Sequence, residues 1–192
     1  MLFGRGRNPW VRCSAFSVPG DHGDVGVPGV SWKGGMTVPQ QMVVIGLGND
    51  YRHDDAVGRV VARKLRAIAG DNVRVVEESG EGAALIEAWN GADFVILIDA
   101  VHSGGAAGTI HRFDAEAQPI PSRFFHYSTH AFSVAEAIEL ARSLDRLPAR
   151  LIVYGIEGKS FDSGVGLSVE AERAADEVLY RVREELCTNS RS

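Results

Sequence analysis

Two aspartates and one histidine stand at positions where their side chains could meet and bind a metal. Asp55 follows an apolar run at 42–47, and Asp99 follows a second apolar run at 94–98. His130 stands at the start of an expected helix. Two carboxylates and one imidazole form an open ligand set that suits a borderline divalent metal and leaves positions for water or substrate. The pattern predicts a metal-dependent site if the fold brings the three side chains together.

Each of these residues also has a structural alternative. Asp54 and Asp55 are adjacent acids at an expected helix start, and we expect one of them to cap that helix. The helix dipole favours negative charge there, so one can serve the helix while the other faces a crevice. Asp99 could be an acidic turn residue or a helix N-cap, although no helix directly follows it. A helix start disfavours a protonated His130, which suits a metal ligand and equally suits a hydrogen-bonded structural residue.

The elements that must position these residues alternate between strand and helix. Short apolar or alternating runs predict strands at about 42–47, 73–77, 94–98, 109–113 and 151–154, the fourth as a short antiparallel edge strand. Apolar residues at helical spacing predict helices at about 55–69, 81–91, 129–144 and from 168 onward. This order indicates an α/β fold, with a parallel or mixed sheet and helices on both faces.

The carboxyl edge of such a sheet is where open α/β proteins build their sites. The loops that carry Asp55, Asp99 and His130 all map to this edge. His53 and His102 lie in loops at the same edge and are second-choice ligands.

The composition indicates one globular domain with an extension before it. Of the chain's 22 glycines and 7 prolines, 8 glycines and 4 prolines fall in residues 1–41, without a sustained apolar period. We therefore expect a flexible extension at 1–41 and a domain at 42–188, with Met36 and Met42 as alternative translation starts.

Charge and hydropathy exclude several classes of partner. The formal net charge is −5, so the chain lacks the excess of positive charge that binds the phosphates of nucleic acid. No apolar run approaches the roughly 20 residues of a membrane helix, and none resembles a secretory signal, so we expect a cytoplasmic protein without membrane insertion. The two cysteines, Cys13 and Cys187, stand in neither a metal-ligand nor a redox spacing.

The Gly-Leu-Gly turn at 46–48 suggests dinucleotide binding, but the rest of that motif is missing. The fingerprint needs a third glycine where Tyr51 stands, and the acids of this loop would repel a pyrophosphate. We interpret the glycines as a tight turn that delivers the chain to Asp55, with Asn49 bracing the turn and Asp54 serving the helix end. The chain has no Gly-x-Ser-x-Gly elbow, no His-Glu-x-x-His motif and no cysteine near the site, so it lacks the marks of the usual protease classes.

At these residues the chain resembles the maturation proteases of nickel-iron hydrogenases, which trim the C-terminus of the hydrogenase large-subunit precursor. The resemblance covers about 42–185. It is carried, in order, by GLGN at 46–49, DDAVG at 54–58, ESGEG at 78–82, LIDA at 97–100, STH at 128–130, VYGIE at 153–157 and GLS at 166–168.

The resemblance implies a mixed five-stranded sheet between helices and an endopeptidase acting on the large-subunit precursor. It places the metal-binding acids on Asp55 and Asp99 and the histidine on His130, with nickel supplied by the precursor, or another divalent metal in its place. The acid after the first strand is often glutamate in the family, so Asp55 is shorter by a methylene.

The turn after the second strand departs from the family's usual aspartate with Gly-Gly-Thr or Gly-Thr. We expect it to recognise the substrate through Glu78, Gly80 and Gly82, together with Asn49. Two other functions remain open, a hydrolase that holds its own metal and cuts a small amide or peptide, and a chaperone that holds the precursor without cutting it.

Overall fold

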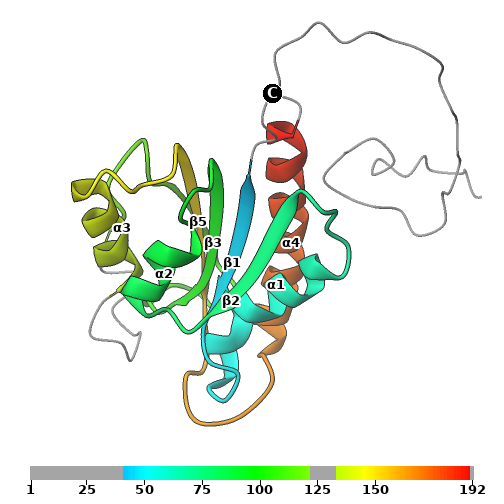
Figure 1. Cartoon of the computed structure of the whole chain (residues 1–192). Coiled ribbons are helices and arrows are strands. Elements are labelled where there is room, and N and C mark those ends of the chain that lie inside the picture. The colour runs from blue at the N-terminus through cyan, green and yellow to red at the C-terminus, as the bar shows by residue number, and fades with distance from the viewer. Residues whose placement is uncertain (1–40, 122–132, 191–192) are drawn as a thin grey trace, which may run out of the picture.

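The computed structural model describes residues 41–121 and 133–190 of the 192-residue chain. At its centre is a five-stranded sheet in the order β2-β1-β3-β5-β4 (Figure 1). The strands are β1 (Met42–Leu47), β2 (Val73–Glu78), β3 (Phe94–Val101), β4 (Ile110–Asp114) and β5 (Arg150–Glu157). All pairs are parallel except β4 with β5. The predicted mixed, mostly parallel sheet with a short antiparallel edge strand is confirmed.

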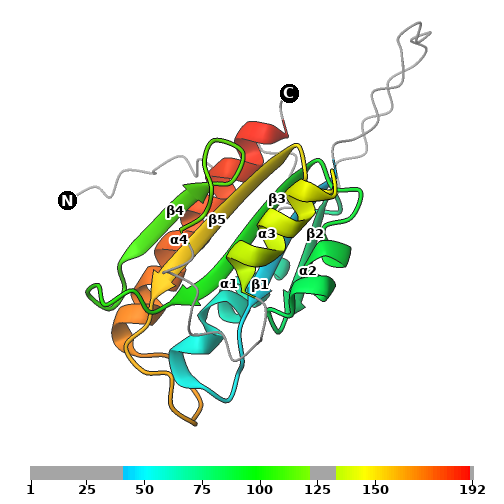
Figure 2. The same cartoon turned by 90° about the vertical axis from the view of Figure 1, so that its left-hand side faces the viewer.

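Helices cover both faces of the sheet and complete three layers (Figures 1 and 2). One face packs against α1 (Val57–Arg66) and α4 (Val169–Asn189), and the other against α2 (Gly82–Ala88) and α3 (Val134–Ser143). The apolar side chains of β3 alternate, with even-numbered residues packing toward α1 and α4 and odd-numbered ones toward α2 and α3. All eight residues of β3 are buried, as the continuous apolar run predicts for a central parallel strand.

The helix starts show which capping signals are used. Glu81, Ser133 and Ser168 are the N-caps of α2, α3 and α4, and each side chain accepts a backbone hydrogen bond from its own first turn. A capping box joins Ser133 and Glu136 at the start of α3, and the predicted start near 129 lies outside the described residues. The prediction that Asp54 or Asp55 caps α1 is wrong, because the 3-10 helix η2 (His53–Ala56) precedes α1 and no side chain caps either helix.

Two strands run further than predicted. β3 continues through Asp99 to Val101 because its pairing with β5 continues, with Asp99 opposite Gly155. β5 likewise continues to Glu157. Asp99 is therefore a residue of the strand, near its carboxyl end, and not the turn residue that follows it.

Residues 1–40 lie outside the described part of the chain, so the extension at 1–41 and the domain boundary stay predictions. Of the described helices, none combines the length and apolar character that crossing a membrane requires.

Candidate active site

The carboxyl ends of β1 and β3 lie side by side, and each leads to one of the predicted acids. The two strands pair directly in parallel, and β3 is the central strand of the sheet. Asp99 lies near the end of β3, and Asp55 lies in η2, just after β1. The prediction that both acids stand at this edge is confirmed, because parallel neighbours end at the same edge.

A tight turn carries the chain from β1 to Asp55. Gly48 has a φ of +127°, and a Cβ there would lie 1.7 Å from the carbonyl oxygen of Asp55. Only glycine allows both this conformation and this approach. The Oδ1 atom of Asn49 accepts a hydrogen bond from the backbone N–H of Tyr51 at 3.0 Å, so Asn49 braces the turn as predicted. These glycines serve close packing, which agrees with the interpretation against a dinucleotide loop.

A second glycine, Gly58, allows the start of α1 to pack closely against β3. A Cβ on Gly58 would lie 2.1 Å from the carbonyl oxygen of Ile98, the residue before Asp99. It would also lie 2.6 Å from the carbonyl oxygen of Leu47, at the end of β1. Because Gly58 follows Asp55 by three positions, this contact holds η2 close to the end of β3.

Asp99 is a buried carboxyl group with little hydrogen-bond support. It continues the odd-numbered row of Val95 and Leu97, so strand alternation turns its side chain toward the face of α2 and α3. The residue is 8% exposed, and its carboxylate accepts one hydrogen bond from the described residues, from the backbone N–H of Ala100 to Oδ1 at 2.9 Å. Burial, and then the negative charge of Asp55, raise the pKa of Asp99 to about 7.

The 3-10 helix η2, which carries Asp55, contacts β3, which carries Asp99, so the fold brings the two acids to the same place. Asp55 is half-buried. His130 lies outside the described residues, so the third predicted ligand is not placed. Among the residues that are described, no group of three His, Cys, Asp or Glu side chains could hold a metal ion. A metal on the two aspartates therefore needs further ligands from elsewhere.

Asp54 has a different task from its neighbour. It is 0% exposed, and its carboxylate accepts hydrogen bonds from the backbone N–H groups of Lys159, Ser160 and Ser168 and from the Ser168 hydroxyl. Burial alone would raise the pKa of Asp54, but these hydrogen bonds outweigh it and lower the pKa. The prediction that Asp54 serves the end of its own helix is wrong, because it binds the distant loop before α4.

Backbone contacts extend this junction into a clasp, which we define as residues 51–54 together with 159–168. The N–H of His53 donates to the carbonyl of Gly164 at 3.1 Å, and the N–H of Gly164 donates to the carbonyl of Tyr51 at 2.9 Å. Arg52 Nε donates to the carbonyl of Phe161 at 3.1 Å. The clasp fixes the segment that leads directly into Asp55.

The two second-choice histidines contact the same loop. Nδ1 of His53 lies 3.3 Å from the carbonyl oxygen of Gly166, at hydrogen-bonding distance. The ring of His102 stacks edge-on against Phe161, with ring centroids 5.4 Å apart. Both contacts are structural, and neither histidine completes a metal-binding group with the described residues.

The expected recognition turn after β2 is partly structural. Gly80 is buried with a φ of +97°, and Gly82 is the buried first residue of α2, so these glycines shape the turn. Glu81 is committed to capping α2. Glu77 forms ion pairs with three arginines of α1, namely Arg59, Arg63 and Arg66. Glu78 is half-buried and forms no ion pair among the described residues.

A further buried acid at the same edge, Glu157, was not among the predicted site residues. It is 1% exposed, and its carboxylate accepts hydrogen bonds from the backbone N–H groups of Ser103, Gly104 and Gly105 and from the Ser103 hydroxyl. It fixes the loop that follows β3. Its signal in the sequence is an acid at the end of a buried strand, the same signal that marks Asp99.

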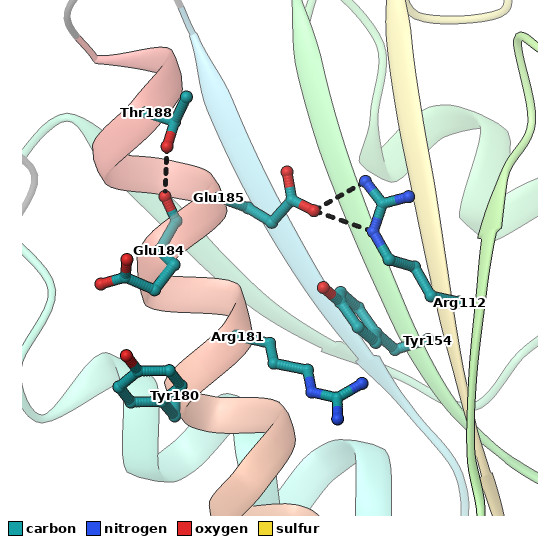
Figure 3. A pocket seen from close by; sticks show the side chains of 7 residues that line it. All are labelled: Arg112, Tyr154, Tyr180, Arg181, Glu184, Glu185 and Thr188. Carbon is teal, nitrogen blue, oxygen red and sulfur yellow. Dashed lines mark hydrogen bonds and ion pairs between the residues drawn. The ribbon is translucent and has the colours of Figure 1, made fainter.

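A hollow of about 280 Å³ lies away from these acids, between α4 and the strands β4 and β5 (Figure 3). It contains none of the predicted site residues. Arg112 fills part of it, and its Nε and Nη2 atoms donate to Oε1 of Glu185 at 2.9 and 2.7 Å. The hollow opens on the α4 face, whereas Asp99 faces α2 and α3, so we place the candidate site at the sheet edge.

Comparison with known proteins identifies relatives for most of the folded region. A family model for hydrogenase maturation proteases matches residues 59–185, a span that includes Asp99 and His130 and begins just after Asp55. The hydrogenase expression/formation protein HupD of Thiocapsa roseopersicina is 26% identical over 124 residues, which are 64% of this chain and 56% of HupD. The chain thus spans little more than half the length of that relative. HoxM of Azotobacter vinelandii, of the same description, is 27% identical over 149 residues, 77% of this chain and 72% of HoxM.

The fold also matches solved structures. The hydrogenase maturating endopeptidase HybD from Escherichia coli is 25% identical, with a TM-score of 0.61 over 76% of this chain and 94% of HybD. The shared architecture agrees with the sheet and helix layers described above.

Proposed function

The chain belongs to the hydrogenase maturation protease family, and on that premise we propose that it is the endopeptidase for a nickel-iron hydrogenase large-subunit precursor. It removes the precursor's C-terminal peptide after nickel has been inserted, and so activates the hydrogenase. The family implies peptidase activity, and the names of HupD and HoxM associate relatives with hydrogenase formation. The reaction takes place in the cytoplasm, where the precursor is assembled.

The observation that carries this proposal is the pair of acids at the sheet edge. Asp99 is buried, with 8% of its surface exposed, and the negative charge of Asp55 adds to the effect of burial in raising the pKa of Asp99. Such a pair binds a divalent cation favourably, because the cation offsets both the burial of the charge and the repulsion between the carboxylates. Asp55, Asp99 and His130 complete the coordination of nickel held by the precursor, while the precursor supplies the other ligands.

The same arrangement supports a checkpoint on cofactor assembly. Because Asp55, Asp99 and His130 leave positions on a metal open, ligands of the precursor complete the site, and the free enzyme depends on the precursor to bring the nickel. Nickel held there by the precursor would orient the scissile peptide beside Asp55 and Asp99 and would supply Lewis-acid assistance to hydrolysis. Glu78 and the turn that Gly80 and Gly82 shape contact the precursor beside this edge, with Asn49 across from them on the neighbouring loop.

The proposal is tested by incubating purified precursor, with and without nickel, with the purified protein and following its mass. We expect loss of the C-terminal peptide from the nickel-loaded precursor and none from the nickel-free form. A loaded precursor that stays at full length while it binds the protein would identify a chaperone instead.

The metal content of the purified protein distinguishes the remaining alternative. We expect less than one equivalent of tightly held metal. One equivalent of firmly bound zinc, together with cleavage of small amides, would identify a hydrolase that carries its own ion.

A further inference from the structure

Six large apolar side chains are exposed among the described residues, and three of them lie on the clasp or at its end. Tyr51 is 74% exposed, Val165 is 70% exposed and Val169 is 60% exposed. The other three are on or next to α3 and α4: Leu140, Leu144 and Tyr180. Single exposed apolar residues are common on protein surfaces, but a gathering on two joined loops indicates a contact surface.

The clasp fixes the backbone that carries these side chains before any partner arrives. The carbonyl of Tyr51 accepts a hydrogen bond from Gly164, the residue before Val165. Val169 follows Ser168, whose N–H and hydroxyl both donate to the carboxylate of Asp54. A surface whose backbone is already fixed loses little conformational entropy on binding.

The position of the clasp points to the substrate as its occupant. Asp55 follows Tyr51 by four positions on the same segment. The cyan connection from β1 to α1 and the orange connection from β5 to α4 lie at the same end of the sheet in both views (Figures 1 and 2). A protein that reaches Asp55 and Asp99 therefore passes close to this apolar surface, and a second copy of the chain seated there would obstruct that approach.

Building on the proposed function, we propose that Tyr51, Val165 and Val169 form a docking surface for apolar side chains of the large-subunit precursor. This docking surface binds the folded body of the precursor beside the cleaved segment. It contributes to affinity and takes no part in the chemistry, since it contacts the body of the precursor and not the cleaved bond.

The test is a double variant, Tyr51→Ser with Val165→Ser, assayed for cleavage of the nickel-loaded precursor. Removing two contacts of this size should raise KM roughly tenfold and leave kcat within about twofold. The matched control is Leu144→Ser with Tyr180→Ser, which removes a leucine and a tyrosine that are 54% and 50% exposed elsewhere. The control should keep the wild-type KM, and circular dichroism should show both double variants folded.

A wild-type KM for the Tyr51/Val165 variant would overturn the proposal, as would an equal rise in the control. Light scattering supplies a further test. If the free protein is a dimer that this variant converts to a monomer, the surface joins two copies and the proposal is wrong. Failure of the wild-type protein to cleave the precursor would instead overturn the proposed function, and direct binding of the precursor to both variants would still report on the docking surface.

Discussion

Two buried aspartates stand at the same edge of the sheet in contrasting surroundings. Asp54 is held in the clasp by four hydrogen bonds from the loop before α4, and these lower its pKa. Asp99 stands at the end of β3 with one hydrogen bond among the described residues, and its pKa is raised to about 7. The first carboxylate is stabilised by the fold as an anion, whereas the second is destabilised as an anion.

The difference in hydrogen bonding distinguishes an acid that stabilises the fold from an acid that is suited to binding a cation. A buried carboxylate whose oxygens meet backbone donors strengthens the fold, because neither partner is left unsatisfied. A buried carboxylate with few donors and a second acid nearby costs free energy when it ionises, and an arriving cation offsets that cost. Perturbed acids of this kind concentrate at functional sites. The contrast identifies Asp54 as a structural acid and supports the proposal that Asp99, with Asp55, recognises the metal.

The largest expected effect separates the neighbours Asp54 and Asp55. Asp55→Asn should lower cleavage of the nickel-loaded precursor by more than about 100-fold, since an amide is a poor metal ligand. Its melting temperature should stay close to that of the wild type, because Asp55 is half-buried at the edge. Mass spectrometry of the precursor and calorimetry of the variant measure the two effects. Cleavage at the wild-type rate would remove Asp55 from the site.

Asp54→Ala should act on stability. It leaves buried donors at Ser168, Lys159 and Ser160 without their acceptor, which costs about 3 kcal/mol of unfolding free energy. Urea unfolding of the variant and the wild type measures the difference. A loss below about 0.5 kcal/mol would show that the clasp does not support the fold.

The two acids should also give opposite dependences of stability on pH. The pKa of Asp99 in the folded protein, about 7, lies above its ordinary value of 3.8, so the folded state holds this proton more tightly. Ionisation of Asp99 therefore lowers the free energy of unfolding as the pH rises between these values. The Asp99→Asn variant lacks this loss, so its stability relative to the wild type should increase from about pH 4 to pH 7. Denaturant titrations at several pH values measure the gain, and a constant difference would contradict the raised pKa.

For Asp54 the sign is reversed. Its pKa is lowered in the folded protein, so its contribution to stability is present above the ordinary carboxyl pKa. That contribution is lost as pH falls through the folded-state pKa. The deficit of an Asp54→Asn variant should therefore be full at neutral pH and shrink in acid. The same titrations test this, and a deficit that grows in acid would contradict it.

The smallest effect compares two helix caps. Ser133→Ala removes the cap of α3 and should cost about 1 kcal/mol. Ser168→Ala removes the cap of α4 and also one of the donors to Asp54, so it should cost roughly 1 kcal/mol more. Equal losses in chemical denaturation would mean that the Ser168 hydroxyl contributes nothing through Asp54.

The sequence predicts that Asp55 and Asp99 lie at one edge of the sheet, but it does not predict the clasp, and one physical reason explains both outcomes. Apolar runs and helical spacing are local signals, so they predict the strands, the layers and the meeting of Asp55 with Asp99 at one edge. The partners of Asp54 lie 105 to 114 positions away, and only the folded chain brings them together. Nothing local tells the adjacent Asp54 and Asp55 apart, and the predicted cap at α1 failed because a 3-10 turn intervenes.

The central claim is that Asp99 and Asp55 recognise nickel carried by the precursor. Its most direct test is a time course of precursor mass, with nickel-loaded and nickel-free precursor each incubated with the wild type and with Asp99→Asn. This substitution keeps the size of the side chain and removes its charge. We expect cleavage only of the loaded precursor and only by the wild type, while the variant stays folded. Cleavage of the loaded precursor by Asp99→Asn at the wild-type rate would contradict the claim.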